Sequence, residues 1–328
     1  MKRHNHTFCP PAFRRAGRHL IRWPGLMLAL FFSTAHFHAS GEETSVLHIG
    51  FSSATFGEVN ENDAIAAVRI WAQDLAQERH IAADPQPKIL RGIAEITAAL
   101  TNGTVDCLDL TTDEYFALKG AVAMEHCVVA VKDGSITEEY VLLVRGDSGI
   151  ERLGDLRGHK LGLLRSSRAS LAPAWSETIL AREGLGSATG FYSQITTASK
   201  ISQAVLPVFF RQLDACVVTR SGFETMVELN PQVGRQLKVL ASSPPVVPVV
   251  FCFRAGYDSP IRAKVLAEIA LWHQTPAGRQ ILTLFQTETL EEQPISCLDT
   301  ALQLLAEHQR LCGETDNQQV GANGGQIK

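Results

Sequence analysis

The alternation of short apolar strands with amphipathic helices predicts an α/β fold for this chain. Apolar runs of strand length are each followed by a segment whose apolar residues recur at helical spacing. Alternating elements of this kind build α/β layers, in which ligands bind at the carboxyl ends of the strands. Polar loops follow strands at four such positions, two in each half of the chain: 52–55, 111–113, 165–170 and 219–221. These loops predict one ligand cleft between two lobes.

In the first half of the chain, predicted strands are followed by helices with one apolar face. The strand at 46–51 precedes a helix that we expect to begin at Asn62. A shorter helix at 93–100 ends at Asn102-Gly103, a pair that is frequent where helices stop. The apolar face of the first helix consists of Ile65, Val68, Trp71 and Leu75.

The second half of the chain continues the alternation and ends in helices. A charged turn at 132–139 joins two long apolar strands, 127–131 and 140–144. Further strands are predicted at 161–164, 214–218, 238–240 and 246–253, and helices at 171–182, 199–210, 260–272, 277–285 and 299–308. Residues 313–328 are polar and rich in glycine, which predicts a disordered tail.

Residues 1–41 have the composition of a secretory signal peptide. They carry six Lys and Arg residues and no Asp or Glu, and an apolar run at 26–32 precedes several small residues. The run is shorter than the roughly 20 apolar residues that span a membrane. We therefore expect export, with cleavage after this leader; an uncleaved anchor is the alternative.

The charge that remains after the leader argues against one class of partner. Without residues 1–41, 24 Lys and Arg residues stand against 34 Asp and Glu residues, a net charge of −10. Proteins that bind nucleic acid concentrate positive charge, so we expect no nucleic-acid partner. A small anionic ligand remains compatible with this charge, because salt screens distant charges from a local site.

Six cysteines follow the leader, and we expect most of them to be buried free thiols. They are Cys107, Cys127, Cys216, Cys252, Cys297 and Cys312. Three lie inside apolar strands, where thiols are commonly core residues. Cys297 and Cys312 flank one helical stretch that would hold them about 22 Å apart, beyond disulfide reach. Since no spacing resembles a zinc site, we expect neither a metal nor a cofactor.

The segment 153–173, LGDLRGHKLGLLRSSRASLAP, has the pattern of an anion site. Its strand at 161–164 ends in a turn of hydroxyl and guanidinium side chains, which we call the serine-rich turn (165–170). Pro173 then suits the first turn of a helix, where its missing N–H is not needed. A helix N-terminus offers free backbone N–H groups and the positive end of the helix dipole. The turn predicts anion binding, and helix capping alone is the structural alternative.

Several segments, in this order, resemble the phosphate/phosphite/phosphonate-binding family of ABC-transporter substrate-binding proteins. The similarity spans residues 46–285 and includes ALTNGTVDCLDL, VLLVRGDSGIERLGDLRGHKLGLL, FFRQLDACVV and SSPPVVPVVFCFR. The resemblance implies a two-lobed type II periplasmic-binding-protein fold with a ligand cleft between the lobes. The expected divisions are a signal peptide (1–41), lobe 1 (42–131), lobe 2 (132–248), a return to lobe 1 with C-terminal helices (249–312) and the tail (313–328).

The resemblance also implies a function and a set of ligand-binding residues. The family's Ser-Thr-Ser-Gly signature is replaced here by Ser166-Ser167-Arg168-Ala169, so Arg168 either pairs with an oxyanion or points to solvent. Micromolar binding needs about 8 kcal/mol, so residues from the other polar loops join the site. Arg220 also has a structural alternative, a pair with Glu224 one helical turn later. The predicted ligand-binding residues are Ser53, Thr55, Thr111, Thr112, Ser166, Ser167, Arg168, Ser170 and Arg220.

The expected function is capture of a phosphonate-, phosphite- or phosphate-like oxyanion by lobe closure, for delivery to an ABC permease. The protein is then periplasmic and, we expect, monomeric. The return strand at 246–250 lacks the acidic residue that some members offer to a ligand ammonium, which argues against an aminoalkylphosphonate. A sensory receptor that presents its ligand to a membrane kinase or cyclase is the alternative. No Ser-His-acid order, metal-ligand cluster or P-loop indicates an enzyme, so no catalytic residue is expected.

Overall fold

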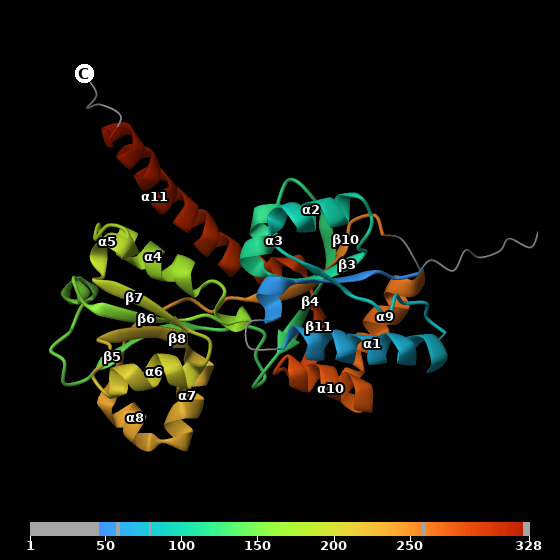
Figure 1. Cartoon of the computed structure of the whole chain (residues 1–328), viewed down its shortest axis with the longest axis horizontal. Helices are drawn as coiled ribbons and strands as arrows, with labels where there is room; N and C mark the ends of the chain where they lie inside the picture. Colours follow the sequence, from blue (N-terminus) through green and yellow to red (C-terminus); the bar gives the residue numbers. More distant parts are fainter. Residues whose placement is uncertain (1–45, 57–59, 79, 258–259, 324–328) are drawn as a thin grey trace, which may run out of the picture. The chain divides into compact units, whose positions relative to one another are not determined.

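The computed structural model describes residues 46–56, 60–78, 80–257 and 260–323, which belong to one unit by their contacts. The signal peptide predicted at 1–41 lies outside the described residues. Strands and helices alternate and build two sheets with helices on their faces, which confirms the predicted α/β class (Figure 1).

The first sheet has the strand order β11-β4-β10-β3-β1-β2. Its strands are β1 (Ile49–Ser52), β2 (Lys88–Leu90), β3 (Cys107–Thr111), β4 (Met124–Val131), β10 (Val249–Arg254) and β11 (Thr289–Gln293). β1 is parallel to β2 and β3, whereas β10 runs antiparallel to β3 and β4. Since β1 and β3 are parallel, Ser52 and Thr111 end their strands at the same edge, where β10 begins.

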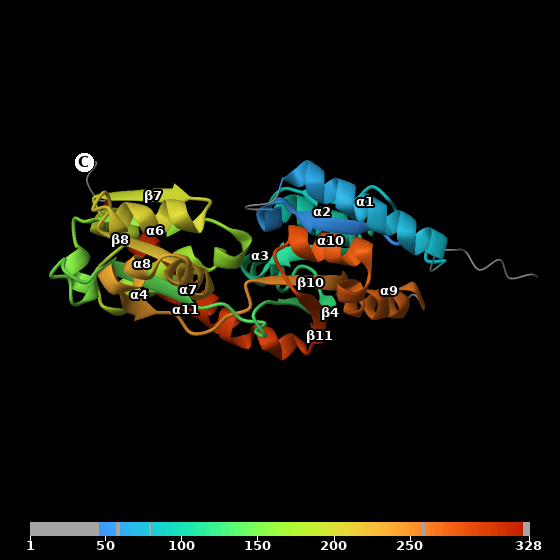
Figure 2. The ribbon, with the colours of Figure 1, turned by 90° about the horizontal axis from the view of Figure 1, so that it is seen from below.

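Each face of the first sheet packs against its own group of helices. One core contains Ile49 and Phe51 of β1 and residues of α1 (Glu61–Glu78), α9 (Pro260–Ala270) and α10 (Pro276–Leu284). The opposite core contains Leu108 and Leu110 of β3 and residues of α2 (Ile93–Thr101) and α3 (Thr112–Leu118). α1 and α10 lie side by side over the first of these faces (Figure 2). The two faces follow from the period-two alternation of side chains along a strand.

The second sheet has the strand order β7-β6-β8-β5-β9. Its strands are β5 (Tyr140–Arg145), β6 (Lys160–Leu164), β7 (Gln194–Ala198), β8 (Ala215–Thr219) and β9 (Leu237–Ser242). Figure 1 shows α4 (Ala172–Arg182) and α5 (Ala188–Phe191) on one face, with α6 (Ile201–Phe209), α7 (Arg220–Leu229) and α8 (Pro231–Gln236) on the other. β6 and β8 are parallel, so the turns that follow them lie at one edge.

Short 3₁₀ turns connect several of these elements and carry the residues at the strand ends. They are η1 (Ser53–Phe56), η2 (Leu153–Leu156), η3 (Ser167–Ala169), η4 (Trp272–Gln274) and η5 (Ile295–Leu298). η1 follows β1, η3 follows β6, and the two turns are in contact. A polar loop from each half of the chain is therefore brought to one place, as the sequence predicted.

The C-terminal helix α11 (Asp299–Asn323) is longer than the sequence predicted. The helix expected over 299–308 continues through 313–323, where disorder was expected, so that prediction was wrong for these residues. Low hydrophobicity argues only against a buried core, whereas a helix that has begun gains one hydrogen bond for each residue added. Residues 324–328 of the predicted tail lie outside the described residues.

α11 packs against α4 of the second sheet. Leu304 and Leu305 join the buried core of that sheet. At the edge of this contact, Arg182 of α4 pairs with Glu307 of α11 (Nη2–Oε2 2.6 Å). The last helix therefore contributes to the core around the second sheet, although the strand that precedes it, β11, belongs to the first.

Candidate ligand-binding site

A cavity of about 100 Å³ lies between one face of the first sheet and the helices that cover it, and we call it the cleft cavity. The first sheet forms the floor of the cavity. Phe51, Asp109 and Phe251 are paired with one another across β1, β3 and β10, and all three line the cavity. Ser167 and Arg168 of the serine-rich turn complete the lining from the second half of the chain. Its polar and charged lining consists of Thr55, Asp109, Ser167, Arg168 and Thr287.

Asp109 is the acidic residue of the cavity lining, and its surroundings are mostly apolar. It lies between Phe51 and Phe251 in the register of the sheet. Loss of hydration raises the pKa of this carboxyl to about 7; a hydrogen bond with Thr55 opposes the shift, and the nearby charge of Glu114 adds to it. The Asp109 carboxyl therefore changes its protonation state near neutral pH. Thr55 is buried, and its hydroxyl also lies 2.9 Å from the carbonyl oxygen of Ser52.

A buried carboxylate, Glu114, ties the ends of β1 and β3 together. Its Oε2 accepts hydrogen bonds from the backbone N–H and the hydroxyl of Thr111, both at 3.0 Å. Its Oε1 accepts a hydrogen bond from Ser52 Oγ at 2.6 Å. The hydroxyl of Thr112 donates to the carbonyl oxygen of Val247 at 2.7 Å. Two predicted ligand-binding residues, Thr111 and Thr112, thus have hydroxyls engaged within the fold, and neither lines the cleft cavity.

We predict that Glu114→Ala lowers the free energy of unfolding by about 2–4 kcal/mol, because three donors lose one buried charged acceptor. Urea denaturation measures this loss. Glu95→Ala is the matched control: Glu95 accepts one exposed backbone hydrogen bond, from Arg91 at 2.7 Å, and we expect a change within about 1 kcal/mol. Equal effects of the two substitutions would contradict the role given to Glu114.

The serine-rich turn folds as the sequence predicted, with η3 leading into α4 and Pro173 in the first turn of that helix. Ser166 precedes η3, and its carbonyl oxygen accepts a hydrogen bond from the N–H of Ala169 at 3.0 Å. The hydroxyl of Ser170 donates to the carbonyl oxygen of Pro248 at 3.1 Å, which holds the turn against the start of β10. Ser167 lines the cleft cavity, and Ser53 of η1 lies in the turn that contacts η3.

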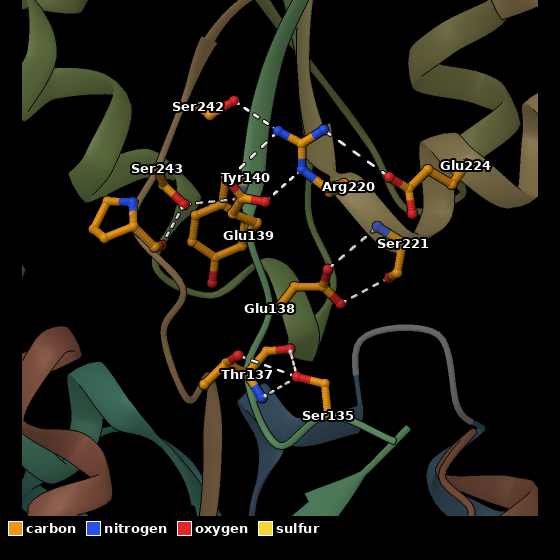
Figure 3. Close-up of polar contacts among 11 residues, drawn as sticks. Ser135, Thr137, Glu138, Glu139, Tyr140, Arg220, Ser221, Glu224, Ser242 and Ser243 are labelled. Carbon is orange, nitrogen blue, oxygen red and sulfur yellow. Dashed lines mark hydrogen bonds and ion pairs between the residues drawn. The ribbon is translucent and has the colours of Figure 1, made fainter. Parts of the chain in front are cut away.

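Arg168 neither points to solvent nor stands alone, because it pairs with a buried carboxylate. Its Nε donates to Glu138 Oε2 at 3.1 Å, and the side chains of Arg168 and Glu138 are 18% and 3% exposed. The same Oε2 accepts from Ser221 Oγ at 2.9 Å (Figure 3). Within the part of the chain that the structure describes, the two terminal nitrogens of Arg168 make no hydrogen bond. Arg168 therefore keeps hydrogen-bond donors beyond its pair with Glu138.

Arg220 belongs to a second, more open hollow beside the cleft cavity and does not line the cavity itself. Its guanidinium pairs with Glu139 and donates from Nη2 to Ser242 Oγ at 2.8 Å (Figure 3). The pair with Glu224, which the sequence offered as an alternative, has an N–O distance of 4.0 Å. These partners hold Arg220 against the start of β5 and the end of β9 rather than against the cavity.

Sequence reasoning missed three carboxyl groups of this region, those of Asp109, Glu114 and Glu138. Asp109 could have been predicted from the sequence, because it lies inside an apolar strand, VDCLDL, where an acidic residue places charge on a buried sheet face. Glu138 was assigned to the charged turn at 132–139. In such a turn the sequence does not distinguish a buried carboxylate from an exposed one. Its pairing with Arg168 spans 30 positions of the chain, and only the tertiary structure brings the two together.

A cavity lined by the first sheet and by the turn that follows β6 agrees with the result of a comparison with protein families. Residues 59–294 match the family described as "ABC transporter, phosphonate, periplasmic substrate-binding protein". The chain belongs to this family. The match covers most of the chain and includes β3, η3 and β10, the elements that surround the cleft cavity. A comparison with curated proteins gives no match.

Solved structures of similar fold confirm the type II periplasmic-binding-protein architecture. A Xanthomonas citri protein bound to chloride ion has a TM-score of 0.61 and 17% identity, over 82% of this chain and 99% of that one. A binding-protein component of an ABC phosphonate transporter from Pseudomonas aeruginosa has a TM-score of 0.55 and 17% identity, over 81% and 87%. PhnD1 from Prochlorococcus marinus, in complex with methylphosphonate, has a TM-score of 0.53 and 13% identity, over 81% and 98%.

Among the residues that the structure describes, no helix combines the length and the apolar character needed to cross a bilayer.

Proposed function

We propose that this protein captures an organic phosphonate in the cleft cavity and delivers it to the permease of an ABC importer. The observation that carries the proposal is the meeting of Ser167 and Arg168 with the strand ends of the first sheet in one cavity. Membership of the phosphonate-binding family supports it and favours uptake over the sensory alternative. The same membership favours a binding protein over an enzyme.

The oxyanion of the ligand lies against the serine-rich turn in this proposal. The hydroxyl of Ser167, the two terminal nitrogens of Arg168 and the first backbone N–H groups of η3 supply donors there. A charge-assisted hydrogen bond contributes about 1.5–3 kcal/mol, so three or four of them reach the roughly 8 kcal/mol of micromolar binding. Ser53 and Ser166 stand in the adjoining turns and complete the proposed contact set.

Binding by closure of two lobes follows because the lining residues of the cavity come from two different segments of the chain. Ser167 and Arg168 come from the segment 132–248, whereas Thr55 and Asp109 come from 42–131. A ligand that contacts both groups stabilises the arrangement in which the two lobes are closed, by its difference in affinity for the closed and open forms. We propose these segments, with the return at 249–312, as the two lobes. The exported protein then acts in the periplasm.

A thermal-shift screen of the purified protein tests this function. The panel contains phosphate, phosphite, methylphosphonate, phenylphosphonate, sulfate, methanesulfonate and acetate. A ligand at 100 times its Kd stabilises the protein by about 2.7 kcal/mol, which corresponds to roughly 5 °C for a chain of this size. We expect the largest shift among the phosphonates. No shift with any phosphorus oxyanion, or a larger shift with acetate, would contradict the proposal.

A further inference from the structure

The cleft cavity is far more apolar than an inorganic oxyanion requires. Away from the serine-rich turn, most of its walls come from α1, α9, η4, α10 and the floor of the first sheet. Phe51 stacks on Phe285 with ring centroids 6.0 Å apart, and Trp71 meets Trp272 edge-on at 5.1 Å. All four rings line the cavity. Among the described residues, the buried indole N–H of Trp272 has no hydrogen-bond partner, whereas the two phenyl rings offer the oxygens of a phosphate no donor.

The size of the cavity sets the size of the group that fits. Its volume of about 100 Å³ is somewhat below the roughly 150 Å³ of an apolar cavity that holds benzene and otherwise stays dry. A substituent no larger than a single benzene ring fills a space of this kind. An inorganic anion held at Ser167 and Arg168 leaves it empty and gains nothing from it.

The polar and apolar parts of the cavity are arranged for one amphiphilic molecule. Donors are concentrated on the side of η3, at Ser167 and Arg168, and aromatic and aliphatic side chains form the side of α1 and α10. Asp109 lies on the sheet floor between these parts. Its carboxyl is neutral below about pH 7, so it does not impose a buried charge on an apolar substituent.

We propose that the ligand is a phosphonate with an apolar organic substituent, aryl or short branched alkyl, which occupies the aromatic part of the cleft cavity. The proposal rests on the proposed function, because it assumes that the phosphonate head lies at the serine-rich turn. It adds the substrate class: the substituent, and not the head group alone, decides which phosphonate is taken up.

Calorimetric titration with methyl-, propyl- and phenylphosphonate tests this class. Each methylene buried in an apolar site raises affinity about fourfold. We therefore expect propylphosphonate to bind about 15-fold more tightly than methylphosphonate, and phenylphosphonate at least about 30-fold more tightly. If affinity stays constant or falls from methyl- to phenylphosphonate while methylphosphonate still binds, the proposed substrate class is wrong and the proposed function stands. No binding of any of the three overturns the proposed function itself.

A variant that fills the cavity distinguishes the contribution of the substituent to affinity from that of the head group. Ala130 of β4 lines the cavity from the sheet floor, so Ala130→Phe should fill the cavity, abolish the gain of phenylphosphonate and leave methylphosphonate affinity within about threefold. Ala241→Phe is the matched control, since Ala241 is a half-buried strand residue of β9 outside the cavity. If Ala130→Phe still binds phenylphosphonate more tightly than methylphosphonate by the full factor, the proposal is contradicted. If that variant does not fold, the titrations of the wild-type protein with the three phosphonates decide the proposal.

Discussion

Arg168→Ala is expected to weaken both phosphonate binding and folding. The substitution removes the terminal guanidinium donors that we assign to the ligand, and it leaves Glu138 buried without its cation. Loss of one partner of a buried ion pair costs about 3–5 kcal/mol. Since Glu138 keeps its hydrogen bonds from Ser221, we expect the lower end of that range in urea denaturation. Affinity for methylphosphonate should fall at least 30-fold in calorimetric titration.

The double substitution Arg168→Ala/Glu138→Gln separates these two effects. A neutral amide at position 138 no longer needs a cation, so most of the lost stability should return while affinity stays low. Arg152→Ala is the matched control, because Arg152 pairs with Asp155 at the same N–O distance of 3.1 Å but is 83% exposed. Exposed pairs contribute about 0–1 kcal/mol. Recovery of affinity in the double variant would show that Arg168 serves the fold alone.

Asp109→Asn is expected to stabilise the protein at pH 8 and to leave it unchanged at pH 4. The folded state holds the Asp109 proton up to about pH 7, whereas the unfolded chain releases it near pH 3.8. The contribution of Asp109 to stability is therefore fully present below pH 3.8 and is lost as the pH rises through 7. Three pKa units correspond to as much as about 4 kcal/mol at pH 8. The pH dependence of thermal unfolding in the two proteins measures this difference.

The same substitution changes ligand binding in a predictable direction. Ionised Asp109 repels an anion in the cavity, so affinity of the wild type should fall between pH 6 and pH 8 relative to Asp109→Asn. Comparison of the two proteins cancels the titration of the ligand itself. Asp147→Asn is the control for general loss of negative charge, because its hydrogen bond from Arg145 lowers the pKa of that exposed carboxyl to about 2. Stabilisation by Asp147→Asn at pH 8 would contradict the explanation for Asp109.

Much of the fold follows from local patterns in the sequence. The strand-to-helix turn around Ser166 and Ser167 was predictable because a strand end, a cluster of hydroxyl groups and Pro173 are all adjacent in the chain. The two cores of the first sheet follow from the alternation of apolar residues in strands such as β1 and β3. These features depend on neighbours within a few positions, where sequence patterns carry the most information.

The roles of individual polar residues depend on contacts that the sequence does not reveal. Arg168 was correctly placed in the turn, yet its partner, Glu138, lies 30 positions away in what reads as an exposed charged loop. Thr111 and Thr112 were correctly placed at a strand end, but their hydroxyls meet Glu114 and a backbone carbonyl oxygen. Both cases show that a strand end predicts the location of a site better than it predicts which hydroxyl remains for a ligand.

A ³¹P NMR titration tests the central claim most directly, because the phosphorus nucleus reports on the head group itself. Methylphosphonate and phenylphosphonate are each titrated with the wild-type protein and with Ser167→Ala/Arg168→Ala/Glu138→Gln, a variant that removes the proposed donors without leaving a buried charge. We predict a shifted or broadened phosphorus signal with the wild type and an unchanged signal with the variant. Equal perturbation by both proteins, or none by either, would contradict a phosphonate site at the serine-rich turn.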